Sequence, residues 1–331
     1  MIDVQALSKR YPTRLAVDDV TFSVKQGEIV GFLGPNGAGK TTTMRVLTGF
    51  LPPTSGSARV AGHDVVTQST AARAALGYLP ESAATYPEMR VSEYLAFRAR
   101  LEGVPDGQVR ARVDEAIERC LLREVARRRI DNLSKGYRQR TALAGALVHQ
   151  PPVLILDEPT IGLDPVQIIR IRETIRELGR DRAVLLSTHI LPEVEAVCDR
   201  VLIIDRGRIV AEGTPAELRG KLAGAPVVRV GIRGRVDPRA AFAALPGVTA
   251  VEAEEGETET TVRVTCEAQT DPREQIFGIA VERGWVLREL ARDALSLEDV
   301  FVRLTRHEEP AAEEAAPAPA DGAPETGATP S

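Results

Sequence analysis

A glycine-rich octapeptide at residues 34–41 narrows the possible folds of this chain more than any other segment. It matches the pattern G-x-x-x-x-G-K-[ST]. The apolar run Ile29–Leu33 comes directly before it and is predicted to be a central strand, because neither of its faces carries a polar residue. The helical run Thr42–Leu47 follows it. A strand, a glycine-rich turn and a helix in this order predict a phosphate-binding loop in an α/β domain.

Each residue type in this loop suits the binding of a polyphosphate. Glycines let successive backbone N–H groups converge on phosphate oxygens without interference from a Cβ. The Lys40 ammonium can reach the β and γ phosphates, Thr41 can ligate Mg²⁺, and the helix N-terminus adds its dipole. We therefore predict a nucleotide-binding segment made of Gly34, Pro35, Asn36, Gly37, Ala38, Gly39, Lys40, Thr41 and Thr42.

A second apolar strand, Val153–Leu156, ends in two adjacent carboxylates. The first, Asp157, can hold Mg²⁺, and the second, Glu158, can orient the water that attacks the γ phosphate in line. We predict Asp157 as a metal residue and Glu158 and Lys40 as catalytic residues. The alternative is a strand that ends in a solvated acidic turn. No N-K-x-D tetrapeptide occurs, which disfavours a guanine-specific enzyme.

A second anion-binding helix end precedes that strand. The segment Leu133–Arg140 leads into the apolar helical run Thr141–Val148, and Ser134 is a good N-cap for it. A serine and a nearby glycine, here Gly136, at the start of a helix can bind an anion. One phosphate loop together with one separate anion-binding helix end suggests a site that two chains share.

In their order along the chain, these motifs resemble those of ATP-binding cassette (ABC) ATPases. The resemblance covers roughly residues 1–218 and implies ATP and Mg²⁺ as cofactors, ATP hydrolysis, and two cassettes bound head to tail. Ser134 and Gly136 would then contact the partner's nucleotide. The segments that carry the resemblance are the phosphate loop, Leu133–Gly136, Asp157–Glu158, Gly162–Asp164 and Ser187–His189.

The resemblance implies further site residues. His189 would contact the γ phosphate and be catalytic, and Tyr11 would stack on the adenine, although a strand-end histidine and a packed turn tyrosine are ordinary alternatives. Asp164 would cross the dimer seam, but with Pro165 it also makes an ordinary helix start. Where the family has a glutamine this chain has Glu81, which can still ligate Mg²⁺ but repels phosphate. The signature reads L-S-K-G-Y in place of L-S-G-G-Q.

The hydrophobic pattern divides the chain into three zones. Residues 1–220 alternate strand and helix patterns, which predicts an α/β domain with a helical subdomain at about 86–132. The resemblance implies that this domain is a P-loop NTPase cassette with a mixed sheet. Residues 226–306 run strand, helix, two strands, helix, strand, which predicts a small α+β ferredoxin-like domain. Residues 307–331 are rich in Ala, Pro and Glu and lack aromatics, so we predict disorder.

Three helical faces carry more specific expectations. In the second helix of the helical subdomain one apolar stripe is predicted to be core. The stripe consists of Val109, Val113, Ala116, Ile117, Cys120 and Leu121. By the resemblance, a preceding helix would form part of a permease-docking surface, and its apolar residues are Val91, Tyr94, Leu95 and Leu101. A capping box at Ser296–Asp299 predicts a last helix that includes Phe301 and Leu304.

Composition limits the partners and the location. The 42 basic and 47 acidic residues give a net charge of −5, so we expect no nucleic-acid partner. The longest apolar runs fall far short of the ~20 residues of a membrane span, and residues 1–4 include an acid and begin no secretory signal. We expect a cytoplasmic protein bound to the inner face of the membrane through a permease. The three cysteines are far apart and predict free thiols.

Two functions remain open at this stage. The first is the ATP-hydrolysing subunit of a transporter that drives a separate membrane permease, with export as the expected direction. Glu81, the signature variant and the ending at 296–305 resemble exporter-type cassettes, including drug-resistance and gliding-motility-associated ones. The second is a soluble ABC-type ATPase acting on nucleic acid, ribosomes or cofactor assembly. The chain has one phosphate loop and no sustained heptads between its motifs, which favours transport.

Overall fold

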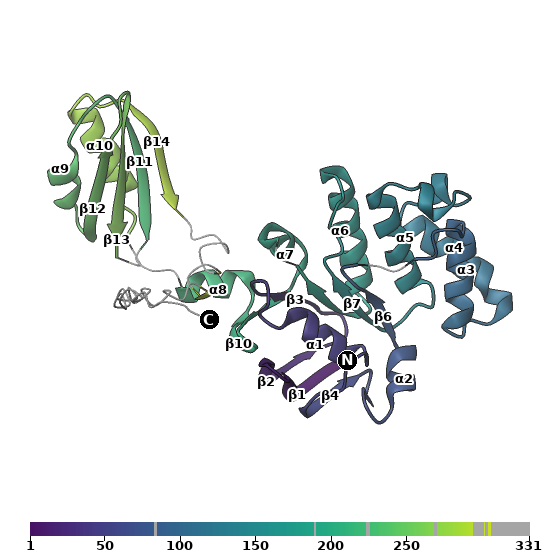
Figure 1. Ribbon diagram of the computed structural model, residues 1–331. Coiled ribbons are helices and arrows are strands. Elements are labelled where there is room, and N and C mark those ends of the chain that lie inside the picture. The colour runs from purple at the N-terminus through teal and green to yellow at the C-terminus, as the bar shows by residue number, and fades with distance from the viewer. Residues whose placement is uncertain are drawn as a thin grey trace, which may run out of the picture.

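The computed structural model describes residues 1–82, 85–188, 190–222, 226–267, 270–293, 301 and 304–305. Figure 1 shows two bodies, one built from the segment before residue 223 and the other from residues 226–293. Three sheets organise them: a six-stranded and a four-stranded sheet in the first body, and a four-stranded sheet in the second. Among the described helices, none is long and apolar enough to cross a membrane.

The six-stranded sheet of the first body has the order β10-β9-β3-β8-β7-β6. Its strands are β3 (Ile29–Leu33), β6 (Leu76–Leu79), β7 (Val153–Asp157), β8 (Ala183–Ser187), β9 (Arg200–Asp205) and β10 (Arg208–Gly213). All neighbours pair in parallel except β10, which closes one edge antiparallel to β9. Every residue of β3, β7 and β8 is buried, as expected for parallel strands covered on both faces. The carboxyl ends of β3 and β7 therefore open at the same edge of the sheet.

A second, antiparallel sheet lies against the first and has the order β2-β1-β4-β5. Its strands are β1 (Ile2–Tyr11), β2 (Arg14–Val24), β4 (Ser55–Val60) and β5 (His63–Asp64). In β2, Val20, Phe22 and Val24 are buried between exposed neighbours, the alternation of a strand that is covered on one face. Helix α1 (Lys40–Leu47) fills the space between the two sheets with buried Met44 and Leu47. The mixed-sheet P-loop fold predicted from the sequence is confirmed.

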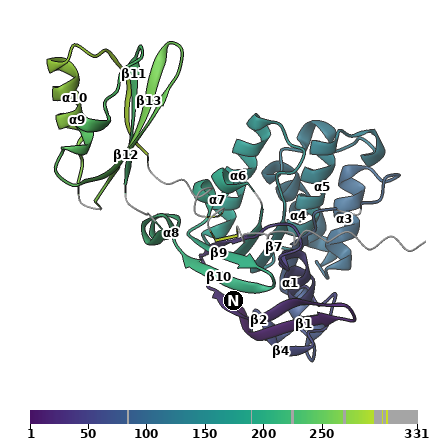
Figure 2. The same ribbon diagram turned by 60° about the vertical axis from the view of Figure 1, so that its left-hand side comes forward.

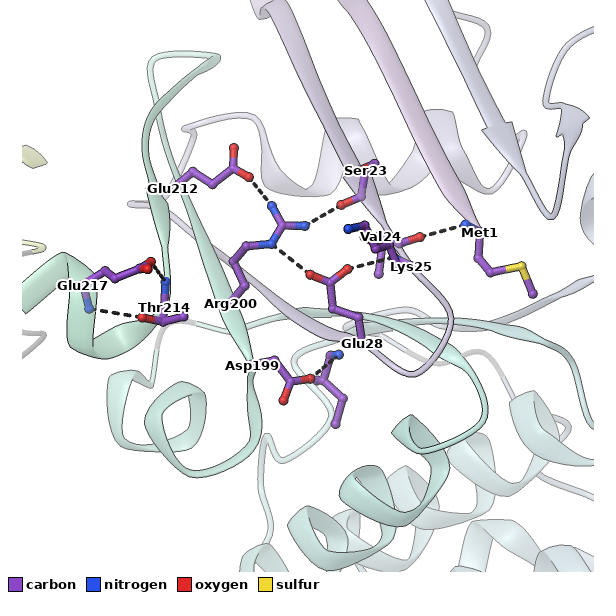
Figure 3. Close-up of polar contacts among 11 residues, drawn as sticks. Met1, Ser23, Val24, Lys25, Glu28, Asp199, Arg200, Glu212, Thr214 and Glu217 are labelled. Atoms are coloured by element: carbon purple, nitrogen blue, oxygen red, sulfur yellow. Dashed lines mark hydrogen bonds and ion pairs between the residues drawn. The ribbon is translucent and has the colours of Figure 1, made fainter.

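Polar contacts around Arg200 hold strands of the two sheets together, as Figure 3 shows. Its Nε lies 2.9 Å from Glu28 Oε1, and its Nη2 donates to the Ser23 carbonyl at 2.6 Å. A second ion pair joins it to Glu212 on β10. The Arg200 side chain is only 20% exposed, so these charges interact with less screening than at an open surface.

Helices α3 (Val91–Leu101), α4 (Asp106–Arg119) and α5 (Lys135–Leu147) gather at one end of the first body, away from β1, β2 and β4 (Figures 1 and 2). In the predicted stripe, every residue from Val109 to Cys120 is buried as expected. The prediction for Leu121 was wrong, because it is 44% exposed. Helix α4 ends at Arg119, and Leu121 has a left-handed backbone with φ 56°, which takes its side chain off the stripe.

Of the four apolar residues on α3, the helix expected to form part of a docking surface, the structure exposes only Leu101. Val91, Tyr94 and Leu95 are buried in the core and cannot meet a partner. Helix α3 packs on both α4 and α5, so its apolar stripe faces those helices. The exposed apolar residues of this region are Leu101, Phe97 and Tyr86.

Helices α6 (Pro165–Gly179), α7 (Leu191–Val197) and α8 (Pro215–Leu222) complete the first body, with α2 (Ser69–Ala74) beside β6. The cysteines are free, as predicted, and all three are buried: Cys120, Cys198 and Cys266. Burial raises the pKa of the Cys120 thiol to about 12. The thiol is therefore protonated and unreactive at neutral pH.

The second body has the element order predicted for a ferredoxin-like domain. Its elements are β11 (Val227–Arg233), α9 (Arg239–Ala243), β12 (Val248–Glu255), β13 (Glu259–Cys266), α10 (Arg273–Glu282) and β14 (Leu287–Asp293). The sheet is fully antiparallel with the order β12-β13-β11-β14. Phe242 is fully buried in a separate core, where its ring meets Trp285 edge-on at 6.0 Å.

The last described residues lie against the first body. Phe301 and Leu304 are helical, half-buried and packed on the core that contains α3 to α7. The predicted capping box at Ser296–Asp299 and the tail at 307–331 lie outside the described residues.

Candidate functional site

A cavity of about 600 Å³ opens at the carboxyl ends of β3 and β7. Its described lining is Arg14, Gly34, Pro35, Asn36, Gly37, Gly39, Lys40, Thr41, Thr42, Glu81, Asp157, Glu158, Ile161 and Phe301. The structure thus brings the phosphate loop, both strand-end acids and Glu81 into one site. Ala38 is buried on the outer side of the loop and borders a neighbouring cavity.

Glycines are required by the shape of the loop. A Cβ on Gly34 would lie 2.4 Å from the Ile204 carbonyl oxygen. Gly39 has φ 113°, and a Cβ there would lie 2.5 Å from the Ala16 carbonyl oxygen. Both contacts are with backbone atoms that cannot move aside. The loop therefore presents its N–H groups to the cavity only with glycine at these positions.

The Lys40 ammonium lies inside the curve of the loop. Its Nζ donates to the Gly34 carbonyl at 2.6 Å and to the Pro35 carbonyl at 3.1 Å. Burial lowers the pKa of Lys40, while the negative charges of Glu158 and Asp157 oppose that shift. The loop and the strand-end acids thus hold a cation at the place where phosphate oxygens would enter.

Asp157 presents an unsatisfied oxygen to the site. The residue is 3% exposed, and within the described part of the chain its buried Oδ2 has no hydrogen-bond partner. Burial raises the pKa of Asp157, and the negative charges of Glu81 and Glu158 raise it further. A buried carboxylate oxygen without a donor is suited to a cation or to a water molecule bound to one.

Glu158 has a backbone conformation that the motif alone does not reveal. Its φ is 51°, in the left-handed region that residues with a Cβ rarely adopt. Three hydrogen bonds to the backbone of Glu158 hold this conformation. Its N–H donates to the Ser187 carbonyl at 2.9 Å, and its carbonyl accepts from Gln139 Nε2 at 3.3 Å and from the Ile161 N–H at 3.2 Å. Such strain is typical of functional residues whose side chains must point in one fixed direction.

The predicted second anion-binding end lies elsewhere on the chain. Ser134 caps α5, and its Oγ accepts the Tyr137 N–H at 3.4 Å. Gly136 lies against α6, where an added Cβ would come within 2.7 Å of Gln167 Oε1. Neither Ser134 nor Gly136 lines the cavity that contains Lys40. Tyr137, at the variant signature position, hydrogen-bonds Glu124 through its hydroxyl.

Other predicted residues are placed differently. Tyr11 is half-buried opposite Arg14 in the β1–β2 hairpin, and of the two only Arg14 lines the cavity. Asp164 caps α6 by accepting the Gln167 N–H at 2.9 Å. His189 lies outside the described residues.

Three cavity residues escaped the sequence reasoning: Arg14, Ile161 and Phe301. Arg14 lies in no motif, and Phe301 was predicted only as a residue of the last helix. Only the position of Ile161, three residues after Glu158, could have suggested a place near the site.

A buried parallel sheet, a glycine-shaped phosphate loop and two acids at the next strand end define a P-loop nucleoside triphosphatase. The family model that matches residues 17–161 is that of the ABC transporter. The chain is also 36% identical to the daunorubicin resistance ATP-binding protein DrrA3 of Streptomyces coeruleorubidus, over 92% of this chain and 95% of the relative. This chain belongs to the ABC transporter family as an ATP-binding protein, and it is an ATPase.

Further comparisons agree with this assignment. The Nod factor export ATP-binding protein I of Paraburkholderia xenovorans is 38% identical, over 93% of this chain and 97% of the relative. A solved ATP-binding subunit of an ABC transporter matches with a TM-score of 0.63 and 32% identity, covering 67% of this chain and 92% of that chain.

Proposed function

We propose that this chain drives export as one half of a head-to-tail pair that acts on a separate integral membrane permease from the inner face of the membrane. The observation that carries the proposal is the placement of Ser134 and Gly136 outside the cavity that contains Lys40. Two anion-binding elements that cannot meet on one chain can meet between two chains. Residues 1–220 would form the cassette and 226–306 an accessory domain.

The direction of transport is inferred from the relatives. Their names refer to daunorubicin resistance and to Nod factor export. They align over 92% and 93% of this chain, so the alignment includes most of the second body as well as the nucleotide site. A relationship over both bodies supports export more strongly than a match to the cassette alone.

The residues at the site also fit Mg²⁺. Asp157 Oδ2, the Thr41 hydroxyl and the Glu81 carboxylate would hold it, and the bound ion would neutralise charge on the β and γ phosphates. No three His, Cys, Asp or Glu side chains of the described residues form a metal-binding group. This set suits Mg²⁺, which usually takes few protein ligands and completes its coordination with phosphate oxygens and water.

The other side chains act on the nucleotide and on water. Lys40 would exchange its bonds to the Gly34 and Pro35 carbonyls for bonds to phosphate oxygens. Glu158 would orient the attacking water toward the γ phosphate and accept its proton. Ser134 and Gly136 of the second chain would close over the same phosphate. Loss of the γ phosphate removes the charge that holds the two surfaces together, and the pair opens.

The test of the shared site uses light scattering on the purified chain. Glu158→Gln should bind ATP but lose turnover, because an amide cannot accept a proton from water, and it should therefore accumulate as a dimer with ATP and Mg²⁺. Adding Ser134→Arg should leave one nucleotide bound per chain and abolish the dimer. Ser55→Arg, at an exposed position of β4, is the control. A full dimer in the Ser134→Arg variant would refute the shared site.

A further inference from the structure

A second buried acid, outside the motifs discussed above, lies behind Glu158. Glu193, in the first turn of α7, is 1% exposed. Thr160 Oγ1 donates to its Oε1 at 2.6 Å, and Arg172 Nη2 lies 3.6 Å from the same oxygen. A buried carboxylate is costly unless it is paired and hydrogen-bonded, and Glu193 is both. Two side chains from α6 and the loop before it thus contact the buried Glu193 carboxylate.

The Thr188 hydroxyl links this acid to the catalytic one. Thr188 Oγ1 lies 3.2 Å from Glu193 Oε2 and 3.4 Å from Glu158 Oε2. It also accepts the Ile190 N–H at 3.1 Å. A hydroxyl has one proton and can donate it to only one of the two carboxylates at a time. Whether Glu193 accepts the Thr188 proton therefore decides how Thr188 interacts with Glu158.

We propose that Glu193 is a positioning residue for ATP hydrolysis, which acts on Glu158 through the Thr188 hydroxyl. By accepting that proton, Glu193 fixes the direction of the Thr188 hydroxyl, and the contact of Thr188 with Glu158 in turn fixes the orientation of the Glu158 carboxylate toward the attacking water. Through Thr160, which is two residues beyond Glu158, it also joins the loop after β7 to the loop after β8. The inference rests on the proposed role of Glu158 and adds a residue to it.

The direct test is Glu193→Gln, which keeps the shape of the side chain. The new amide N–H₂ donates to Thr188 Oγ1, so the Thr188 proton turns toward Glu158 Oε2 and draws that carboxylate away from the position in which it orients the attacking water. We expect kcat to fall about 10- to 100-fold, the range that a displaced catalytic group produces. KM for ATP should stay within about twofold, because the phosphate loop makes the binding contacts.

The control on the same helix is Glu195→Gln. Glu195 is two residues away, partly exposed and paired with Arg219 at 2.5 Å, so its loss should leave kcat unchanged. A second pair of variants keeps the test independent of folding of the Glu193 variant. Thr160→Ser retains the hydroxyl that donates a hydrogen bond to Glu193, so its kcat should stay within about threefold of wild type. Thr160→Val has a side chain of equal size without the hydroxyl, and its kcat should fall at least about tenfold.

Steady-state ATPase assays on the full chain, with thermal melts to verify folding, decide the matter. A Glu193→Gln chain that folds and has wild-type kcat would overturn the proposal. So would equal losses in Thr160→Ser and Thr160→Val, which indicate a purely structural role. Glu158→Gln is assayed alongside. If it is inert while Glu193→Gln is normal, only this inference fails. If Glu158→Gln hydrolyses ATP normally, the proposed role of Glu158 fails as well.

Discussion

At the scale of single residues, Asp157 shows a conflict between stability and function. Burial raises the pKa of this carboxyl above its ordinary value of 3.8, so the folded chain binds the proton more tightly than the unfolded chain does. The ionised form therefore destabilises the fold, and this effect grows as the pH rises through and above the ordinary pKa. A cation bound at Oδ2 would offset the cost.

The first prediction follows for Asp157→Asn, which removes that charge. At pH 7 and without nucleotide we expect the free energy of unfolding to increase by about 1 kcal/mol, which corresponds to a rise in Tm of about 3 °C. The variant should also lose its ATPase activity. The gain should vanish near pH 3, where the wild-type carboxyl is protonated. Asp106→Asn, at a side chain 87% exposed, is the control and should leave Tm unchanged. A lower Tm for Asp157→Asn at pH 7 would contradict the interpretation.

Much of the site could be predicted at this scale because its residues are contiguous. The phosphate loop, Asp157 and Glu158 each follow a buried strand, and the edge of a parallel sheet brings such strand ends together. The contacts of Glu193 could not be predicted, since they join three separate segments. The left-handed φ of Glu158 was equally hidden, because nothing in its residue type favours that conformation.

At the scale of elements, Arg200 joins strands that are remote in sequence. It contacts Glu28 beside β3, the Ser23 carbonyl of β2 and Glu212 of β10. Loss of this side chain leaves Glu28 partly buried without its cation, and an unpaired buried charge costs more than the pair contributes.

The second prediction follows for Arg200→Met, which keeps most of the apolar stem. We expect the free energy of unfolding to fall by about 2 kcal/mol, measured by urea denaturation. Arg208→Met is the matched control, because its ion pair with Asp18 at 2.6 Å involves an arginine 69% exposed. Exposed pairs contribute little, so that change should stay within about 0.5 kcal/mol. If the free energy of unfolding falls equally in the two variants, the contacts of Arg200 stabilise the fold no more than an exposed ion pair does.

Periodicity predicted the elements well where one face of an element is buried. The predicted stripe from Val109 to Cys120 on α4 was confirmed. Periodicity failed where an element ended or had neighbours on several sides. Leu121 lies one residue past the C-cap of α4, and α3 hides Tyr94 because α4 and α5 both pack on it. The spacing of apolar residues does not reveal where a helix ends or how many elements pack against it.

At the scale of the whole molecule, the far end of the described chain returns to the nucleotide site. Phe301 lines the same cavity as Asn36 and Ile161, and Thr305 borders the outer side of the phosphate loop beside Gly37. In the proposed pair, the Ser134 segment of a second chain would have to approach this same mouth. In that arrangement, the ring of Phe301 would stand in the way of closure.

The third prediction follows for Phe301→Ala in the full chain. With the obstructing ring removed, we expect the ATP-dependent dimer to tighten about threefold to tenfold, about 1 kcal/mol. Sedimentation velocity across a range of chain concentrations measures this constant. Phe277→Ala, at a ring 57% exposed on α10, is the control and should leave the constant unchanged. A weaker dimer for Phe301→Ala would show that the ring belongs to the interface.

The burial of all three native cysteines has a practical consequence for measuring how the proposed pair closes and opens. Maleimide dyes react with exposed thiolates, so the wild-type chain should take up almost no label under native conditions. A single exposed substitution such as Ser55→Cys, on β4, could then carry a fluorophore with the native thiols left in place. Quenching or energy transfer between two such dyes would record each closing and opening in real time, during turnover, without altering the nucleotide site.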